Sequence, residues 1–283
     1  MNTLKRMSAA IAIAMAFVFV TSSTPASAED MPKGDLPGWH QVLADNFNGQ
    51  KVALGQFGDC NHNADTKQAY CAKLPEPYKS RWWAYPKNWP DTANQRNYTQ
   101  KGVYNPEQTV WIGPSSTGDG QMHIKMFRTT GLNQVATLVP KKMMDQKYGR
   151  YAIRFKAQTT KGYKLAWLLW PTINDAGSEI DFPELELNGN ISGFMHYRDG
   201  SGQAAFDTHK PYGVWRTAII EWKPNDVKFY LDGNLVGHTT KLIPNKNMSW
   251  DIQSESALNG DSAAKNSSAQ IDITWVAGYT YAP

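Results

Sequence analysis

Residues 151–157 read YAIRFKA, and this stretch decides the fold class because Tyr151, Ile153 and Phe155 alternate with more polar neighbours. A period of two is typical of a strand with one buried face, whereas a helix repeats every 3.6 residues. The stretch MHIKMF at 122–127 alternates in the same way. Further strand-like runs, separated by turn residues, are found at 163–170, 179–187, 191–197, 217–222, 227–231 and 271–279.

The turns between these runs favour antiparallel pairing. Asp232 and Gly233 separate two alternating runs, and Asp-Gly suits the tight primed turn of a hairpin. Downstream of residue 28 we find no stretch of ten or more residues with helical apolar spacing. The sequence therefore predicts an all-β, antiparallel β-sandwich.

The first 28 residues have the pattern of a secretory signal peptide. Lys5 and Arg6 precede an apolar run over residues 11–20, and an Ala-Ser-Ala sequence ends at Ala28. The run is shorter than the roughly 20 residues that span a bilayer, so we expect no membrane anchor. We therefore expect a secreted, extracellular protein with a single domain over residues 29–283.

Composition and charge exclude several classes of protein. The chain holds 11 Trp, 13 Tyr and 10 Phe and is only 19% charged, which disfavours disordered and coiled-coil proteins. With Lys5 and Arg6 removed, 27 basic and 25 acidic residues leave a net charge of +2. Nucleic-acid binding needs a basic face, so we expect no nucleic-acid partner and an uncharged ligand instead.

The two cysteines, Cys60 and Cys71, are close in sequence and are expected to form a disulfide in an oxidising compartment. Residues 59–99 are rich in Asn, Pro and aromatic side chains and show little alternation. We predict a long loop over one face of the sandwich, held by this disulfide. Long ordered loops usually serve a functional site.

The densest group of acids lies in SEIDFPELE at residues 178–186. On a regular strand Glu179 and Asp181 share one face, and Glu184 points to the other. Pro183 changes this expectation, because a proline inside a strand is tolerated mainly at an edge or a bulge. A bulge turns Glu184 back, so that three carboxyl groups line one face.

Three neighbouring acids need a reason, because their charges repel one another. Retaining glycoside hydrolysis needs two carboxyl groups about 5 to 5.5 Å apart, one as nucleophile and one as proton donor. Asp181 between them would orient Glu179 and help to keep Glu184 protonated. A solvated acidic strand or a cation site is the alternative interpretation of the same residues.

The stretch at residues 179–184 resembles the E-x-D-x-x-E signature of glycoside hydrolase family 16, in the bulged form of laminarinases, agarases and carrageenases. Further matches follow in family order across residues 39–281. They are Tyr148–Tyr151 with Arg154, Ala166–Pro171, Glu221-Trp222, Pro224, Phe229-Tyr230, Asp232-Gly233 and Asp272. Pro183 stands where the family often has Met, and the residues after Glu184 are unfamiliar, which bears on the substrate more than on the reaction.

The resemblance implies a concanavalin A-like jelly roll with a concave substrate cleft. It implies that Glu179 is the nucleophile, Glu184 the acid/base and Asp181 the assisting residue. Relatives carry a structural calcium on the convex side, which leaves such an ion open near Asp272, although no spacing here identifies it. No cofactor is required, and we expect no catalytic metal because the six histidines lack metal-ligand spacing.

Aromatic side chains are the expected sugar-binding groups. We predict Trp167, on the strand before the acids, as a wall of the cleft, and Trp89 in the long loop as a weaker candidate. A role in core packing is the alternative for each. His196 lies in the strand-like run 191–197, which follows the run that carries the acids. It is expected either to lie near Glu179 or to be a structural residue.

The sequence thus predicts a monomeric, secreted, retaining endo-glycosidase whose partner is a β-linked polysaccharide, first of all a β-1,3- or β-1,3/1,4-glucan. Two alternatives stay open. One is a hydrolase of another β-glycan, such as a galactan or a cell-wall glycan. The other is a non-catalytic, lectin-like carbohydrate-binding protein of the same fold.

Overall fold

The computed structural model describes residues 29–63, 66, 68–114, 120–129, 131–173 and 177–283. The chain divides into two units, Met1–Asp30 and Met31–Pro283, and the following description concerns the second. The signal peptide expected at residues 1–28 lies outside the described residues. No helix in the described part of the chain is long and apolar enough to span a membrane.

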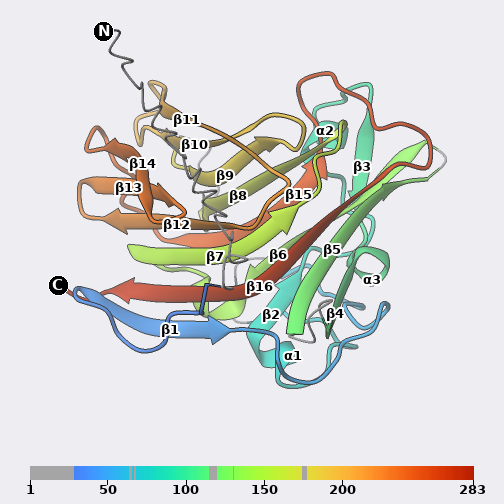
Figure 1. Ribbon diagram of the computed structural model, residues 1–283, viewed down its shortest axis with the longest axis horizontal. Helices are drawn as coiled ribbons and strands as arrows, with labels where there is room; N and C mark the ends of the chain where they lie inside the picture. The colour runs from blue at the N-terminus through green and yellow to red at the C-terminus, as the bar shows by residue number, and fades with distance from the viewer. Residues whose placement is uncertain (1–28, 64–65, 67, 115–119, 130, 174–176) are drawn as a thin grey trace, which may run out of the picture. The chain divides into compact units, whose positions relative to one another are not determined.

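Strands dominate the described residues (Figure 1). The strands are β1 (Trp39–Asp45), β2 (Trp82–Ala84), β3 (Lys101–Tyr104), β4 (Val110–Pro114), β5 (Gly120–Arg128), β6 (Leu132–Pro140), β7 (Gly149–Ala157), β8 (Tyr163–Pro171), β9 (Ile180–Glu186), β10 (Asn190–His196), β11 (Gln203–Pro211), β12 (Arg216–Lys223), β13 (Asp226–Leu231), β14 (Asn234–Thr239), β15 (Met248–Ser256) and β16 (Ser268–Tyr281). The helical segments are α1 (Tyr78–Arg81), α2 (Thr92–Gln95), α3 (Pro106–Thr109) and the 3-10 turn η1 (Lys141–Met143).

The strands form two layers. The first layer has the order β11-β10-β9-β8-β15-β6 and the second the order β5-β16-β7-β12-β13-β14, and pairing of β6 with β5 joins the two layers into one continuous sheet. Strands β1 and β4 extend the second layer beside β16 and β5, and β2 pairs with β6. These pairs are antiparallel, whereas β3 pairs with β6 in parallel. The fold is the expected antiparallel sandwich, with this one parallel addition.

The core lies between the two layers and is rich in aromatic rings. The ring centroids of Phe155 on β7 and Trp167 on β8 are 4.6 Å apart, and those of Tyr151 and Trp250 are 5.5 Å apart. All four side chains are buried. Each large apolar side chain contributes roughly 1.5–3 kcal/mol when it leaves water. Packing between the layers therefore holds the first sheet in place.

The strands expected from alternation are confirmed, with ends that differ by a few residues. The hairpin turn is also confirmed, because Asp232 and Gly233 both have positive φ, 51° and 77°. Two central strands were not expected. Strand β6 is buried on both faces, so its sequence does not alternate. Strand β15 does alternate, since Trp250 and Ile252 face the core between polar residues.

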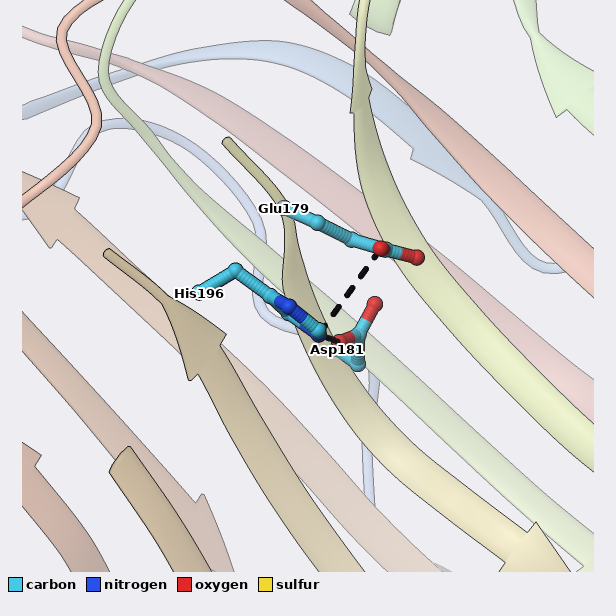
Figure 2. A group of neighbouring side chains, drawn as sticks. All are labelled: Glu179, Asp181 and His196. Carbon is cyan, nitrogen blue, oxygen red and sulfur yellow. Dashed lines mark ion pairs between the residues drawn. The ribbon is translucent and has the colours of Figure 1, made fainter. Parts of the chain in front are cut away.

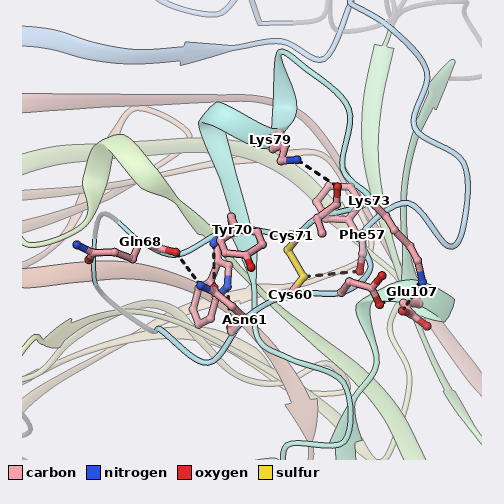
Figure 3. Close-up of a disulfide and its surroundings, with 12 residues drawn as sticks. Phe57, Cys60, Asn61, Gln68, Tyr70, Cys71, Lys73, Lys79 and Glu107 are labelled. Carbon is pink, nitrogen blue, oxygen red and sulfur yellow. Dashed lines mark hydrogen bonds and ion pairs between the residues drawn. A yellow bond between two sulfur atoms is a disulfide. The ribbon is translucent and has the colours of Figure 1, made fainter.

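The disulfide between Cys60 and Cys71 is present, with an S–S distance of 1.99 Å (Figure 3). Polar contacts reinforce the loop that it closes: Nδ2 of Asn61 donates to the carbonyl of Gln68 at 2.7 Å. Lys73 forms an ion pair with Glu107, before β4, at 3.5 Å. The predicted loop at 59–99 contains β2, α1 and α2, and these contacts fix the part of it around the disulfide.

Candidate active site

The register of β9 shows the expected bulge. On β8, Ala166 pairs with Glu184 and Leu168 with Asp181, so a step of two residues faces a step of three. The same shift occurs on β10, where Ser192 pairs with Glu184. The extra residue falls at Phe182–Pro183, and it returns Glu184 to the face of Asp181, as the proline predicts.

All three acids face one cavity of about 590 Å³ on the first sheet. Glu179 directly precedes β9, and its carbonyl accepts a hydrogen bond of 2.8 Å from the amide of His196. The Glu179 and Glu184 side chains are 19% and 18% exposed, whereas Asp181 is buried. The carboxyl groups of Glu179 and Glu184 can therefore reach a ligand, whereas the buried carboxyl of Asp181 can act only through its neighbours.

His196 faces the first two acids (Figure 2). Its Nε2 lies 3.3 Å from Oδ2 of Asp181 and 3.7 Å from Oε2 of Glu179. His196 also lines the cavity. The structure thus places His196 near Glu179, which was one of the two positions expected for it.

Burial is the main electrostatic influence on Glu179 and Asp181. It raises the pKa of Glu179 to about 9, and the charge of Asp181 adds to this effect. Burial and the charge of Glu184 raise the pKa of Asp181 well above its ordinary value. The ligand atoms of Glu179 and Asp181 lie within 4.8 Å of each other, so the two carboxyl groups titrate together, and both hold their protons to higher pH than free carboxyl groups do. Attack by Glu179 requires its ionised form, in which the proton of the pair lies on Asp181.

Glu184 has a different environment. Nζ of Lys164 on β8 donates to Oε1 of Glu184 at 2.8 Å. The hydroxyl of Tyr212, a buried side chain between β11 and β12, donates to the backbone carbonyl of Glu184 at 3.1 Å. Neither contact was predicted from the sequence. The carboxyl of Glu184 is thus held by a cation, and its backbone is held separately.

The prediction for Trp167 is wrong. Trp167 is 0% exposed and packs against Phe155 in the core, because the odd-numbered residues of β8 face the second sheet. The even-numbered residues line the cavity, and they include Lys164 and Trp170. Lys164, a charged residue at an even position of this apolar run, is the signal in the sequence that the even face points to the cleft. Trp170 is therefore the aromatic wall that β8 supplies.

Trp89 lies beside the cavity and is not among the described residues that line it. Its Nε1 donates to Nδ1 of His62 at 2.6 Å, and its ring packs edge-on against Tyr85. Tyr85 does line the cavity. Trp89 therefore supports a wall residue, and the loop reaches the cavity through Tyr85 and α2.

Strand β15 supplies a second acidic wall that the sequence did not lead us to expect. Asp251 accepts a hydrogen bond of 2.9 Å from the hydroxyl of Tyr85. Glu255 accepts from the hydroxyls of Tyr104 and Thr92 and from Nε2 of Gln253. These side chains line the cavity on β15, which is separated from β9 by β8 in the same layer. The wall offers hydrogen-bond partners of the kind that sugar hydroxyl groups use.

Glu179, Asp181 and His196 form a group whose ligand atoms lie within 4.8 Å of one another, close enough to hold a metal ion. A cation there would take the lone pairs that the nucleophile needs, so metal binding and attack by Glu179 exclude each other. At Asp272, Oδ1 accepts hydrogen bonds of 2.7 Å from Nδ1 of His123 and from Nε2 of Gln270. Calcium requires oxygen ligands, so these residues do not fit a calcium ion at that oxygen.

A bulged strand with three acids above a cleft in a β-sandwich defines a glycoside hydrolase type of site. The family profile of "Glycosyl hydrolases family 16" matches residues 105–277. The chain belongs to this family.

Sequence relatives include the beta-glucanase of Bacillus subtilis, which is 30% identical over 105 residues. The alignment covers 34% of this chain and 42% of that relative, so the chain spans less than half of its length. Solved structures show the same fold. The laminarinase of Rhodothermus marinus has a TM-score of 0.62 at 17% identity, covering 87% of this chain and 98% of that one. The laminarinase of Flavobacterium sp. UMI-01 has a TM-score of 0.58 at 14% identity, covering 85% and 100%.

Proposed function

We propose that this protein is a secreted, retaining endo-glycosidase that hydrolyses a β-linked glucan with β-1,3 or mixed β-1,3/1,4 linkages. One observation carries the proposal. The bulge in β9 turns Glu184 to the face of Glu179 and Asp181, so that one strand presents a nucleophile, its partner and a proton donor to a single cavity.

The reaction follows from these positions in two steps. The carboxylate of Glu179 attacks the anomeric carbon while Glu184 gives its proton to the leaving glycosidic oxygen. Asp181 holds the proton that it shares with Glu179, which leaves the nucleophile ionised. Water then attacks the glycosyl-Glu179 ester, Glu184 takes the proton from this water, and the sugar leaves with its original anomeric configuration.

The cavity supports a neutral substrate. Its aromatic wall groups are Tyr85, Tyr104, Trp170 and Phe194. Its acidic groups are Glu179, Asp181, Glu184, Asp251 and Glu255, against Lys164 and Arg96 as the lysine and arginine side chains. An excess of carboxyl groups repels a polyanionic chain and favours an uncharged one. This balance supports a glucan over a strongly sulfated galactan.

The names of relatives point to the same substrate class. Several sequence relatives are beta-glucanases, and one solved relative is described as a non-specific endo-beta-1,3(4)-glucanase. Secretion is proposed from the pattern of residues 1–28, and the disulfide suits an oxidising compartment. We propose that the protein acts as a monomer.

The test is to incubate the protein with laminarin, mixed-linkage β-glucan, agarose, carrageenan and cell-wall glycans, and to measure new reducing ends. The proposal predicts release from a β-1,3-containing glucan as oligosaccharides, with the β-anomer formed first in a ¹H NMR time course. New reducing ends from agarose or carrageenan alone would show that the substrate is a galactan and not a glucan. Binding to a glycan without release would favour the lectin-like alternative.

A further inference from the structure

We propose that Lys164 is a positioning residue for Glu184. Its ammonium group binds Oε1 of Glu184, so that the other oxygen, Oε2, carries the proton that Glu184 transfers. This inference rests on the proposed function, because it concerns the acid/base of that reaction. It adds a specific residue, and a specific oxygen atom, to the step in which the leaving group departs.

The contact is direct and enclosed. Nζ of Lys164 lies 2.8 Å from Oε1 of Glu184, and the Lys164 side chain is only 7% exposed. The register explains how the two side chains meet. Glu184 pairs with Ala166 on β8, and Lys164 is two residues along the same strand on the same face. A lysine enclosed in this way has few alternative positions, unlike a surface lysine.

Other carboxyl groups keep the ammonium charged without competing for this contact. Lys164 is the cross-strand partner of Glu255 on β15 and of Glu186 on β9. Burial lowers the pKa of Lys164, but the charges of Glu184, Glu255 and Glu186 outweigh burial and raise it. Glu255 accepts hydrogen bonds from Tyr104 and Thr92, and Glu186 accepts one from the amide of Leu258. Glu184 thus receives the short contact with Nζ.

The chemistry of the ammonium group decides which oxygen transfers the proton. An ammonium group has three donors and no acceptor, so an oxygen that accepts from it cannot also point a proton at it. The proton that Glu184 delivers therefore sits on Oε2. When this proton moves to the leaving oxygen, Glu184 becomes a carboxylate and Lys164 faces the new charge. The same charged contact holds Glu184 while it accepts a proton from the attacking water.

The test uses the whole protein and two substrates, which differ in whether their leaving group needs a proton from Glu184. A glucan leaves as a poor alkoxide and needs the proton, whereas a dinitrophenyl β-glycoside of the same sugar leaves without it. We expect Lys164→Met to lower kcat/KM on the glucan by about 100-fold and on the dinitrophenyl glycoside by less than about 3-fold. Because kcat/KM reports steps up to glycosylation, the difference isolates the acid role.

Two further variants make the comparison specific. Lys164→Arg keeps the positive charge and is expected to recover most of the loss on the glucan. Lys161→Met removes a surface lysine that pairs with Asp261 at 2.9 Å, and it is expected to leave both rates unchanged. Equal losses of Lys164→Met on both substrates, or no loss on either, would overturn the proposal.

A crystal structure of Lys164→Met gives a readout that does not depend on activity. We expect the carboxyl of Glu184 to leave its present position, because the contact that holds Oε1 is gone. An unchanged Glu184 would overturn the positioning role. If the wild-type protein cleaves neither substrate, the proposed function fails, and the crystal structure still decides whether Lys164 positions Glu184.

Discussion

Nε2 of His196 lies 3.3 Å from Oδ2 of Asp181, within a cavity wall that also contains Glu179. A single imidazole therefore faces two carboxyl groups that repel each other. The charge of His196 lowers the pKa of Glu179, against the larger effects of burial and of Asp181. His196 thus favours the ionised nucleophile, and this relationship leads to the first prediction.

Replacing His196 with Gln should move the acidic limb of the kcat/KM profile to higher pH. The physical reason is that the charge of His196 lowers the pKa of Glu179, so this pKa rises further when the imidazole is removed. The rate falls as pH falls through this pKa, so the limb follows the pKa upward. Rates of glucan hydrolysis measured from about pH 5 to about pH 11, on both sides of the Glu179 pKa of about 9, test the shift. His209→Gln, at an exposed site, is the control, and an acidic limb that stays in place in His196→Gln would contradict the role.

Stability should also depend on the ionisation of Glu179. Burial raises the Glu179 pKa from 4.5 to about 9, so between these values the Glu179–Asp181 pair of the folded state keeps a proton that the unfolded chain loses. Stability therefore falls as pH rises through this window. Glu179→Gln removes the effect, and we expect its Tm to exceed that of the wild type at pH 8 but not at pH 4.

Calorimetry at both pH values measures this difference. For a chain of this size, each kcal/mol of added stability raises Tm by roughly 2–4 °C. Glu76→Gln, at an exposed position, serves as the control and is expected to show no gain at pH 8. A Glu179→Gln variant with the same Tm as the wild type at both pH values would show that Glu179 ionises freely in the folded protein.

The two tryptophans of β8 should respond differently to truncation. Trp170 lines the cavity, so Trp170→Ala is expected to raise KM for the polysaccharide with a small change in Tm. Trp167 is fully buried, so Trp167→Ala is expected to lower the free energy of unfolding by about 3–5 kcal/mol. Steady-state kinetics and denaturant unfolding separate the two effects. A Trp167→Ala variant with a raised KM and unchanged stability would contradict this prediction and show that Trp167 binds the substrate.

Removing the disulfide should loosen the segment that carries α2. The variant Cys60→Ser/Cys71→Ser loses a bridge with a sequence separation of 11 and should lose roughly 3 kcal/mol of stability. Urea unfolding with and without a thiol reductant measures this loss. The reductant should lower the midpoint of the wild type to that of the variant and leave the variant unchanged. If the reductant does not change the unfolding midpoint of the wild type, the disulfide contributes nothing to stability.

Much of the first sheet was predictable from the sequence, because alternation identifies half-buried strands and Pro183 identifies the bulge that gathers the acids. It was harder to predict which face of β8 lines the cavity. Both faces carry a tryptophan, and only the parity of Lys164 distinguishes them. The contact between Lys164 and Glu184 could not be predicted, because it depends on the register between two strands. Strand β6 was missed because both of its faces are buried, which removes the alternation.

The central claim is that Glu179 is the nucleophile and Glu184 the acid/base of a retaining hydrolysis. The most direct measurement is glucan hydrolysis by Glu179→Gln and Glu184→Gln, with and without added azide, together with circular dichroism of each variant. The account predicts that both variants fold and lose about 1,000-fold or more in kcat on the glucan. With a dinitrophenyl β-glycoside, which leaves without a proton, the account also predicts that azide restores product formation, as the α-glycosyl azide from Glu179→Ala, where truncation makes room for azide, and as the β-glycosyl azide from Glu184→Gln. A folded Glu179→Gln protein with full activity would contradict the account.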